Sequence, residues 1–492
     1  MNTVILPPSA SSLMESTRSI GYSLEAAVAD IVDNCIAAEA SSIDINFFPI
    51  NDPYIVIADD GQGMSAEELQ ASMRYGSKNP LCTRAENDLG RYGLGLKTAS
   101  LSQCQILTVA SKKDGMISCC RWDLHHIRKT NEWELLVLGE EETSKLPCFE
   151  FLENKPHGTL VIWQDLDRIF SSGDVQHDVL GAKMVKVREH LSLVFHRYLS
   201  GEPDLRRIQI KLNNENIPPA DPFLQGKSTK AMADEKLFIR NNHKVIVRAY
   251  ILPHISKLSK QDLDALGGKD GLRKSQGFYV YRNKRLVVWG TWFRMMVKGD
   301  LSKLARIQVD IPNSLDELWT LDIKKSTAIP PEEVQKNLRK IVEKIAEKSK
   351  QTWTFRGKIE RSSEKKEIWN RIKTRDGGFL YQINREHFLI NEIKQKAPEI
   401  TQALETMFRL IEERLPLNSL YVDLVQDEKI VNNDEVLPQE VLSQLKNILS
   451  IFSTASEKRA ALSCILDQPP FCNHQEYIKQ HWKDLCENAS QH

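Results

Sequence analysis

The sequence predicts an α+β fold in which helices cover a mostly antiparallel sheet near the N-terminus. Residues 23–40 carry apolar side chains at helical spacing behind Ser23, which can cap a helix. Several short runs then combine apolar and alternating residues, as strands do. These runs are 43–47, 54–58, 105–111, 116–122, 133–138 and 160–163. Helices packed in one layer against such a sheet form an α+β sandwich.

Local signals place three connections within this predicted sandwich. Ser65 and Glu68 have the spacing of a capping box and predict a helix that ends near Met73. Residues 112–115 read Lys-Lys-Asp-Gly, which favours a tight turn between two strands. The glycine-rich segment 90–95 leads into a helix that we predict over 96–102.

We predict three domains, at residues 1–180, 181–331 and 332–492. The polar stretch 170–180 separates the first from the second, and two prolines at 330–331 precede the third, where proline suits a helix start. The second domain is expected to begin with a helix over 181–199 and then to be rich in strands. Its expected strands are 207–212, 244–252, 277–281, 285–289 and 306–310, with a turn at 282–284. The third domain is predicted to be mainly helical.

Composition excludes few functions. The 492 residues are 41% hydrophobic and 27% charged, which is ordinary for a globular protein. Lys plus Arg and Asp plus Glu both total 66, so the overall charge points to no partner. No apolar run approaches the ~20 residues of a membrane span. The first residues lack the pattern of a signal peptide, and the nine cysteines show no framework spacing, so we expect a cytoplasmic protein with reduced thiols.

The first chemical motif lies on the predicted helix 23–40. Asp30, Asp33 and Asn34 stand at positions i, i+3 and i+4, which places them on one side of a helix. A carboxylate there can act as a base, and an amide oxygen can bind magnesium, which takes oxygen ligands and keeps several waters. A solvated polar helix face has the same pattern, and this motif alone favours that simpler interpretation.

The second motif is Asp59, Gly61 and Gly63, directly after an apolar strand. A carboxylate at this position can accept a hydrogen bond from an adenine amino group, and glycines allow the backbone to approach a base closely. An ordinary Asp-Gly turn is the alternative.

The third motif is the glycine-rich segment that contains Gly90, Gly93 and Gly95, with Lys97 just behind it. Glycines spaced in this way let successive N–H groups face a phosphate, and a helix N-terminus adds a favourable dipole. The order differs from the dinucleotide-binding fingerprint, and the chain has no Walker-type phosphate loop. A flexible connector is the alternative for this segment.

These motifs occur in an order that resembles the GHKL ATPase domain of gyrase B, MutL, sensor histidine kinases and the large heat-shock chaperones. The stretch GYSLEAAVADIVDNCIAA, with Arg91-Tyr92-Gly93 and Leu96-Lys97, is most similar to bacterial relatives of the MORC ATPases. The resemblance is strong over about residues 15–165 and moderate over 200–331. It implies a GHKL ATP-binding sandwich for the first domain and an α/β transducer domain for the second.

The resemblance also implies roles for individual residues, with ATP and Mg²⁺ as the ligands. Asn34 matches the magnesium ligand, and Asp59 matches the aspartate that reads adenine, with Thr159 beside it through a water. The turn around the base matches Gly61, Gly63 and Met64. The lid that wraps the phosphates matches Ser77, Lys78, Gly90, Gly93, Gly95, Leu96 and Lys97.

Two catalytic assignments follow from the same resemblance. The family usually has a glutamate as general base four residues before the magnesium asparagine, and here that position is Asp30. A carboxylate one methylene shorter can still orient a water, so we expect slow ATP hydrolysis. Transducer domains send a lysine to the γ-phosphate, for which Lys325 is the first choice and Lys324 the second. Both could equally be surface lysines at a strand end.

The expected partners are ATP, a second copy of the chain and DNA, with no membrane. Residues 336–376 hold fourteen Lys or Arg and six Asp or Glu, with interleaved aromatic residues, a pattern that suits nucleic acid. A solvated helical face with internal ion pairs explains the pattern equally well. The resemblance implies an ATP-driven homodimer that clamps DNA, with protein partners in a restriction-like or anti-phage system. The alternative is a chaperone-like or scaffold ATPase with a protein client and no nucleic acid.

Overall fold

The computed structural model divides the chain into two compact units, Met1–Phe355 and Arg356–His492. Each unit is described by itself. The structure describes residues 3, 6, 8–19, 21–76, 95–170, 176–239, 243–253, 257–299, 302–315, 319, 330–354, 368–373, 379–415, 438–452, 454–466 and 471–481.

The first unit contains an eight-stranded sheet in the order β5-β4-β3-β6-β2-β1-β7-β8. Its strands are β1 (Ser42–Phe48), β2 (Tyr54–Asp59), β3 (Ile106–Lys113), β4 (Met116–Asp123), β5 (Leu136–Val137), β6 (Gly158–Gln164), β7 (Gln209–Leu212) and β8 (Glu215–Asn216). Neighbouring strands are antiparallel, except that β7 runs parallel to β1. The predicted antiparallel sheet is therefore present.

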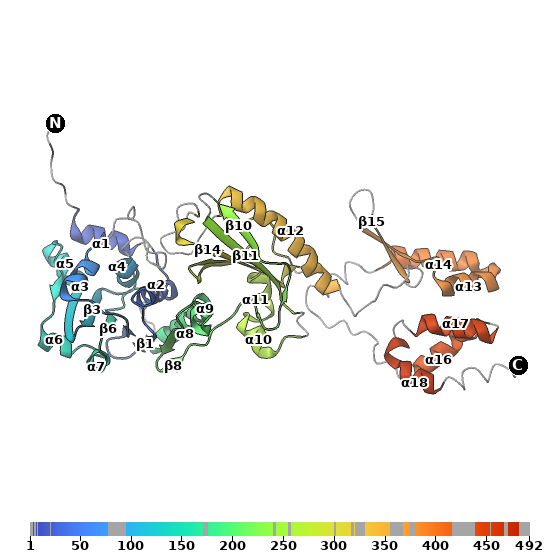
Figure 1. Cartoon of the computed structure of the whole chain (residues 1–492), viewed down its shortest axis with the longest axis horizontal. Helices are drawn as coiled ribbons and strands as arrows, with labels where there is room; N and C mark the ends of the chain where they lie inside the picture. The colour runs from blue at the N-terminus through green and yellow to red at the C-terminus, as the bar shows by residue number, and fades with distance from the viewer. Residues whose placement is uncertain are drawn as a thin grey trace. The chain divides into compact units, whose positions relative to one another are not determined.

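Helices cover both faces of this sheet. Successive side chains of a strand point to opposite faces. On β2, Ile55 and Ile57 face the larger core, while Val56 and Ala58 face a smaller one. Figure 1 shows these helices around the sheet. The larger core is covered by α1 (Ala10–Arg18), α2 (Leu24–Ala37), α3 (Ala66–Met73), α4 (Gly95–Leu101), α5 (Leu124–Thr130), α8 (Gln176–Val194) and α9 (His196–Ser200). The smaller core includes Leu152 of α7 (Glu150–Glu153) and Leu146, which follows α6 (Glu140–Ser144).

The local signals in the sequence explain how these elements begin. The Ser23 side chain accepts a hydrogen bond at the start of α2, and Ser65 with Glu68 forms the expected capping box of α3. Asp114 and Gly115 both have positive φ, at 51° and 80°, in the turn between β3 and β4. Only a two-residue strand, β5, forms within the stretch 133–138 that was expected to be a longer one.

The first sheet extends further along the chain than the sequence suggested. We expected residues 207–212 to belong to the second domain, but β7 pairs with β1 over Ser42–Ile45. Ile208, Ile210 and Leu212 are buried in the larger core. Helix α8 runs across the predicted boundary at residue 180. The isolated strand pattern could not reveal its partner, because pairing between distant segments depends on tertiary packing.

A second sheet follows in the same unit, in the order β10-β11-β14-β12-β13, with β9 paired to β11. Its strands are β9 (Thr229–Lys230), β10 (Glu235–Ile239), β11 (His243–Ile251), β12 (Gly277–Arg282), β13 (Arg285–Thr291) and β14 (Ala305–Ile311), and two short helices, α10 (Lys260–Ala265) and α11 (Gly268–Lys274), lie between β11 and β12. The hairpin of β12 and β13 turns at Asn283 and Lys284, whose φ values are 48° and 66°. This is the turn that the sequence predicted at 282–284.

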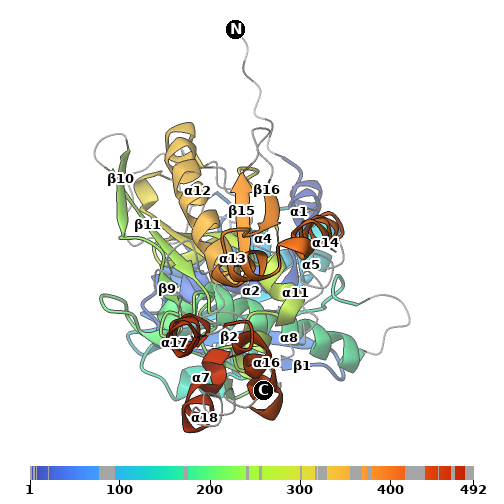
Figure 2. The same ribbon diagram turned by 90° about the vertical axis from the view of Figure 1, so that its right-hand side faces the viewer.

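Helix α12 (Glu332–Thr354) covers one face of the second sheet. Its residues Val334, Leu338, Ile341 and Ile345 are buried in the same core as β11, β12 and β14. Figures 1 and 2 both show α12 beside β10 and β11. The apolar side of this helix therefore faces the second sheet.

The second unit combines helices with a short hairpin. The hairpin pairs β15 (Trp369–Lys373) with β16 (Phe379–Ile383). The helices are α13 (Phe388–Lys396), α14 (Thr401–Glu413), α16 (Pro438–Leu449), α17 (Ala455–Ile465) and α18 (Gln475–Gln480). Among the described residues of the whole chain, no helix combines the length and apolar character that a membrane span requires.

Candidate functional site

Three polar side chains form a row across β2, β6 and β3, close to one end of each of these strands. Asp59 ends β2 and lies opposite Thr159 of β6, and Thr159 lies opposite Ser111 of β3. The Ser111 and Thr159 hydroxyl oxygens are 2.9 Å apart. Ser111 also donates to the Gly158 carbonyl at 3.0 Å and accepts from the Met64 N–H at 2.9 Å. These bonds fix the loop after β2 to the neighbouring strands.

Asp59 is a buried carboxylate, with 4% of its surface exposed. Its Oδ1 accepts a hydrogen bond from the Gly61 N–H at 2.8 Å. Burial raises the pKa of Asp59 to about 6, although the Gly61 N–H and the Cys35 thiol both favour the charged form. Burial and the neighbouring Asp59 raise the pKa of the Cys35 thiol well above its usual value. At neutral pH Asp59 is mainly ionised, so it remains a strong hydrogen-bond acceptor.

The glycines around Asp59 are required by the packing of the protein itself. A Cβ on Gly61 would lie 2.7 Å from the Ala38 carbonyl oxygen at the end of α2. Gly63, with φ of 67°, would place a Cβ 2.0 Å from the Lys112 carbonyl oxygen. We expected these glycines to serve the approach of a base. The structure adds that they let the loop pack against α2 and β3.

The three polar residues of the first motif, all on α2, differ in their exposure to solvent. Asp30 and Asp33 are buried, whereas Asn34 is exposed. The Tyr22 hydroxyl donates to Asp30 Oδ2 at 3.1 Å. The Tyr22 carbonyl in turn accepts from the Gln103 side chain at 3.1 Å. The arrangement therefore differs from a wholly solvated face, because two of the three side chains are held inside the unit.

An arginine from the second sheet reaches the same two carboxylates. Arg285, the first residue of β13, places its Nε 3.1 Å from Asp33 and its Nη2 4.0 Å from Asp30 Oδ1. The acidic side of α2 is therefore a contact between the first sheet's helices and the second sheet.

The residues at the start of α4 are close to α3. Leu96 packs on the larger core. Lys97 is only 1% exposed and donates from Nζ to the Ser72 carbonyl at 2.8 Å. Burial lowers the pKa of Lys97 to about 8. The structure thus gives this ammonium a partner on α3, and its predicted contact with the phosphates remains a prediction.

Several predicted site residues lie outside the described part of the chain. They are Ser77, Lys78, Gly90 and Gly93 of the predicted lid, and Lys324 and Lys325 of the predicted γ-phosphate contact. The predicted site residues that the structure does describe are Asp30, Asn34, Asp59, Gly61, Gly63, Met64, Gly95, Leu96, Lys97 and Thr159.

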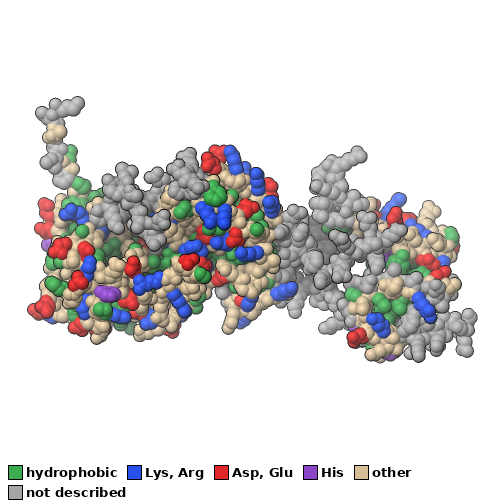
Figure 3. Space-filling model, viewed as in Figure 1, with side chains coloured by type: hydrophobic (Ala, Val, Ile, Leu, Met, Phe, Trp, Pro, Cys, Tyr) green, Lys and Arg blue, Asp and Glu red, His purple; other side chains and the backbone are tan. Residues whose placement is uncertain are grey.

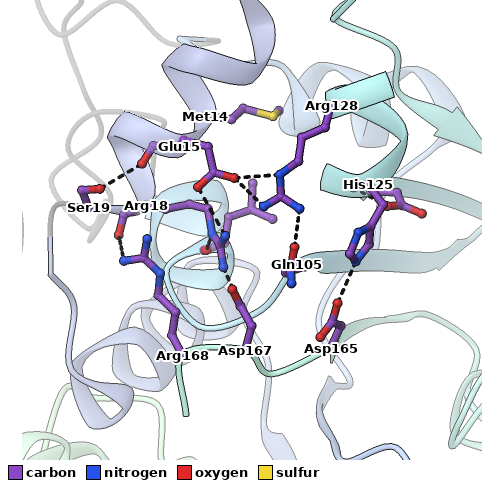
Figure 4. A network of polar contacts seen from close by, with 12 residues as sticks. Met14, Glu15, Arg18, Ser19, Gln105, His125, Arg128, Asp165, Asp167 and Arg168 are labelled. Atoms are coloured by element: carbon purple, nitrogen blue, oxygen red, sulfur yellow. Dashed lines mark hydrogen bonds and ion pairs between the residues drawn. The ribbon is translucent and has the colours of Figure 1, made fainter. Parts of the chain in front are cut away.

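A polar network next to the site anchors the N-terminal helix α1 (Figure 4). Buried Arg18 pairs with Asp167 at 2.6 Å and donates to the Leu101 carbonyl, the last of α4, at 2.7 Å. Glu15 pairs with Arg128 of α5 at 2.5 Å. These contacts fix the end of α4. Gln103, which follows α4, is bonded in turn to the Tyr22 carbonyl before α2.

The buried carboxylate of Asp59 at the end of β2, the glycine loop after it and the exposed Asn34 on α2 all belong to the first unit. The comparison with known families agrees. Residues 22–159 match the family model described as histidine kinase-, DNA gyrase B- and HSP90-like ATPase. Residues 22–159 are therefore similar to the GHKL ATPase domain, as the motifs predicted.

A second comparison finds a MORC protein among the relatives. The chain is 34% identical over 93 residues to ATPase morc-1 of Caenorhabditis elegans. The similar segment covers 19% of this chain and 10% of the relative, so the chain spans about a tenth of that protein's length. The ATPase domain is thus MORC-like in sequence.

Sequence reasoning missed Ser111, Tyr22 and Arg285. Ser111 lies in an alternating strand, where a small polar residue carries no signal of its own. Tyr22 lies in the stretch that resembles the MORC proteins, but nothing in the sequence linked it to Asp30. Arg285 is 252 positions from Asp33, so only the tertiary structure brings the two together.

Proposed function

We propose that the chain binds and hydrolyses Mg-ATP at the end of the first sheet. The observation that carries this proposal is the buried Asp59 carboxylate, aligned with Thr159 and Ser111 across three strands. A buried acceptor that stays ionised at neutral pH suits the amino group of adenine. Thr159 would complete this contact through a water, and the loop of Gly61, Gly63 and Met64 would border the base.

The residues present also fit a magnesium ion by their donor chemistry. Asn34 offers an exposed amide oxygen on α2, and Mg²⁺ accepts one protein oxygen beside phosphates and waters. Bound there, the ion would neutralise phosphate charge. Asp30, one turn earlier on α2, is the carboxylate that would orient the attacking water. The family resemblance extends the site to Ser77, Lys78, Gly90, Gly93, Gly95, Leu96 and Lys97 as the lid and to Lys325, with Lys324 as second choice, as the γ-phosphate contact.

Calorimetry and steady-state hydrolysis test this proposal on the full chain. Wild type should bind Mg-ATP saturably and hydrolyse it slowly. Asp30→Ala should keep binding within about threefold and lower kcat at least tenfold. Glu25→Ala is the matched control on the same helix and should leave both unchanged. Folded wild type that gives no binding signal with millimolar nucleotide would exclude an ATP site.

We further propose that ATP binding pairs two copies of the chain into a clamp on DNA, as the MORC-like sequence suggests. The described support is helix α12, which exposes Lys336, Arg339, Lys340 and Lys344 while its apolar side faces the second sheet. Figure 3 shows Lys and Arg side chains along α12, with acidic side chains near its start. Phosphate contacts by such residues make affinity fall with salt. The inferred setting is a restriction-like or anti-phage system with its own protein partners.

DNA binding and dimerisation are tested separately. Duplex DNA should bind with an affinity that falls as salt rises, and Lys340→Glu with Lys344→Glu should weaken it at least tenfold. Glu343→Lys, on the same stretch of the helix, should not weaken it. Asn34→Ala should abolish ATP-dependent dimerisation and keep DNA binding. An active ATPase that binds no DNA at low salt would favour a protein client.

A further inference from the structure

Arg285 connects the second sheet to the acidic side of α2. It begins β13 directly after the tight turn at Asn283 and Lys284, and it is 5% exposed. Its Nε is bound to Asp33 at 3.1 Å, and Nη2 lies 4.0 Å from Asp30 Oδ1. The same guanidinium donates to the Leu286 carbonyl at 3.1 Å and lies over the Phe195 ring. Both the backbone and the ring thus hold the cation in place.

The charges at this contact depend on one another. Asp30 and Asp33 are two carboxylates one helical turn apart, and both are buried. Burying charged groups is costly unless opposite charges and hydrogen bonds compensate them. Arg285 reaches both carboxylates and is closer to Asp33, while the Tyr22 hydroxyl donates to the other oxygen of Asp30, Oδ2. Removing the cation would take the positive charge of Arg285 away from both carboxylates and would alter the contacts that set the orientation of Asp30.

The hairpin that carries Arg285 is fixed to helix α9. The Tyr198 hydroxyl donates to the Asn283 carbonyl at 2.6 Å in the turn itself. His196 Nε2 lies 2.7 Å from the Tyr281 hydroxyl on β12. These contacts link the hairpin that carries Arg285 to α9, and Arg285 links the same hairpin to α2.

We propose that Arg285 is a positioning residue for ATP hydrolysis. Asp30 is the carboxylate proposed to orient the attacking water. Through its contacts with Asp33 and Asp30, Arg285 makes the orientation of Asp30 depend on the position of the second sheet relative to α2. This inference rests on the proposed ATPase function. It adds a contact from the second sheet that acts on Asp30, the carboxylate proposed to orient the water. This contact is separate from the lysine proposed to bind the γ-phosphate.

The test compares full-length Arg285→Met, Arg285→Lys, Asp33→Asn and the double variant Arg285→Met/Asp33→Asn. Lys284→Met, one residue away, is the control for loss of a positive charge. Mg-ATP affinity by calorimetry, kcat, KM and the thermal midpoint are measured for each. Arg285→Met should lower kcat at least tenfold and change KM and the dissociation constant less than threefold. The control should match wild type.

The double variant separates positioning from stability. Arg285→Met removes the arginine that pairs with the buried Asp33 carboxylate. Asp33→Asn removes the negative charge of that carboxylate, so the double variant should regain thermal stability. Its kcat should nevertheless stay as low as that of Arg285→Met, because residues that act as a unit show non-additive losses. A kcat that returns to wild type along with stability would overturn the proposal and leave Arg285 a structural residue.

Arg285→Lys keeps the proposal testable if Arg285→Met does not fold. A lysine keeps the charge but cannot reproduce the fork of donors that faces two carboxylates. It should lower kcat at least threefold with unchanged Mg-ATP affinity, and a wild-type kcat would overturn the proposal. Wild type that binds no Mg-ATP would instead remove the proposed ATPase function, so the two failures are distinct.

Discussion

Replacing Asp59 by asparagine should separate the stability of the domain from its affinity for ATP. Burial raises the pKa of Asp59 from 3.8 to about 6. A shift of about 2 units corresponds to about 3 kcal/mol, because each unit is 1.36 kcal/mol. The folded state thus carries this cost whenever Asp59 is ionised. An asparagine avoids the charge but buries an amide that needs a partner, so we expect a net stabilisation of about 1–2 kcal/mol at pH 7.

The sign of the pH dependence provides an internal check. A carboxyl group whose folded pKa is raised contributes stability that is present below the unfolded pKa of 3.8 and is lost as pH rises through about 6. Near pH 4 the folded wild-type side chain is neutral, as asparagine is at every pH, so most of the cost of the buried charge is absent. The difference in unfolding free energy between Asp59→Asn and wild type should therefore be small at pH 4 and grow towards pH 7. Urea denaturation at several pH values measures it.

The same variant should bind Mg-ATP at least tenfold more weakly at pH 7.5, because a hydrogen bond to a charged acceptor is worth about 1.5–3 kcal/mol. Asp60→Asn is the matched control. Asp60 accepts hydrogen bonds from the Ser41 and Ser42 N–H groups at 2.7 and 2.8 Å, so its loss should lower stability and leave ATP affinity unchanged. Unchanged affinity in Asp59→Asn, or equal effects in the two variants, would refute the role of Asp59.

Four further substitutions, one of them a control, test the packing around the site by urea denaturation. Gly63→Ala should lower the unfolding free energy by about 3 kcal/mol or more, because its Cβ would clash, whereas Gly115→Ala meets open space and should cost only about 1–2 kcal/mol; equal losses would contradict the clash. Ser111→Ala should cost about 1–3 kcal/mol, because it removes the buried hydroxyl that accepts from the half-buried Met64 N–H, and an unchanged midpoint would argue against that bond. Arg18→Met removes a buried cation that pairs with the exposed Asp167 and donates to the Leu101 carbonyl, and it should cost about 1–3 kcal/mol, while an unchanged unfolding free energy would show that these contacts contribute little.

Features encoded over short stretches were predictable from the sequence. Ser23 and the pair Ser65 and Glu68 mark helix starts through side chains that bond to nearby N–H groups. The strands of the first sheet alternate because each has two differently packed faces. Asp59 was singled out because a carboxylate followed by two spaced glycines occurred with the other motifs in a recognisable order, and the structure buries it at the end of β2.

Features that depend on distant segments were not predictable. The pairing of β7 with β1 joins residues about 165 positions apart, and its four-residue pattern names no partner. The contact of Arg285 with Asp33 is likewise invisible, because an arginine after a turn is ordinary on any surface. Burial also changed the expectation for Lys97, since a lysine beside a glycine-rich loop gives no sign that it will bond to Ser72.

The parallel strand β7 determines where this domain could be cut out for separate study. A fragment that stopped at residue 180 would end inside α8 and leave the N–H and C=O groups along one side of β1 without their partner strand. Exposed strand edges of this kind invite pairing with other chains, so such a fragment should aggregate. A longer fragment that ran past Ile217 would keep β7, β8 and their buried side chains, and β1 would stay covered on that side.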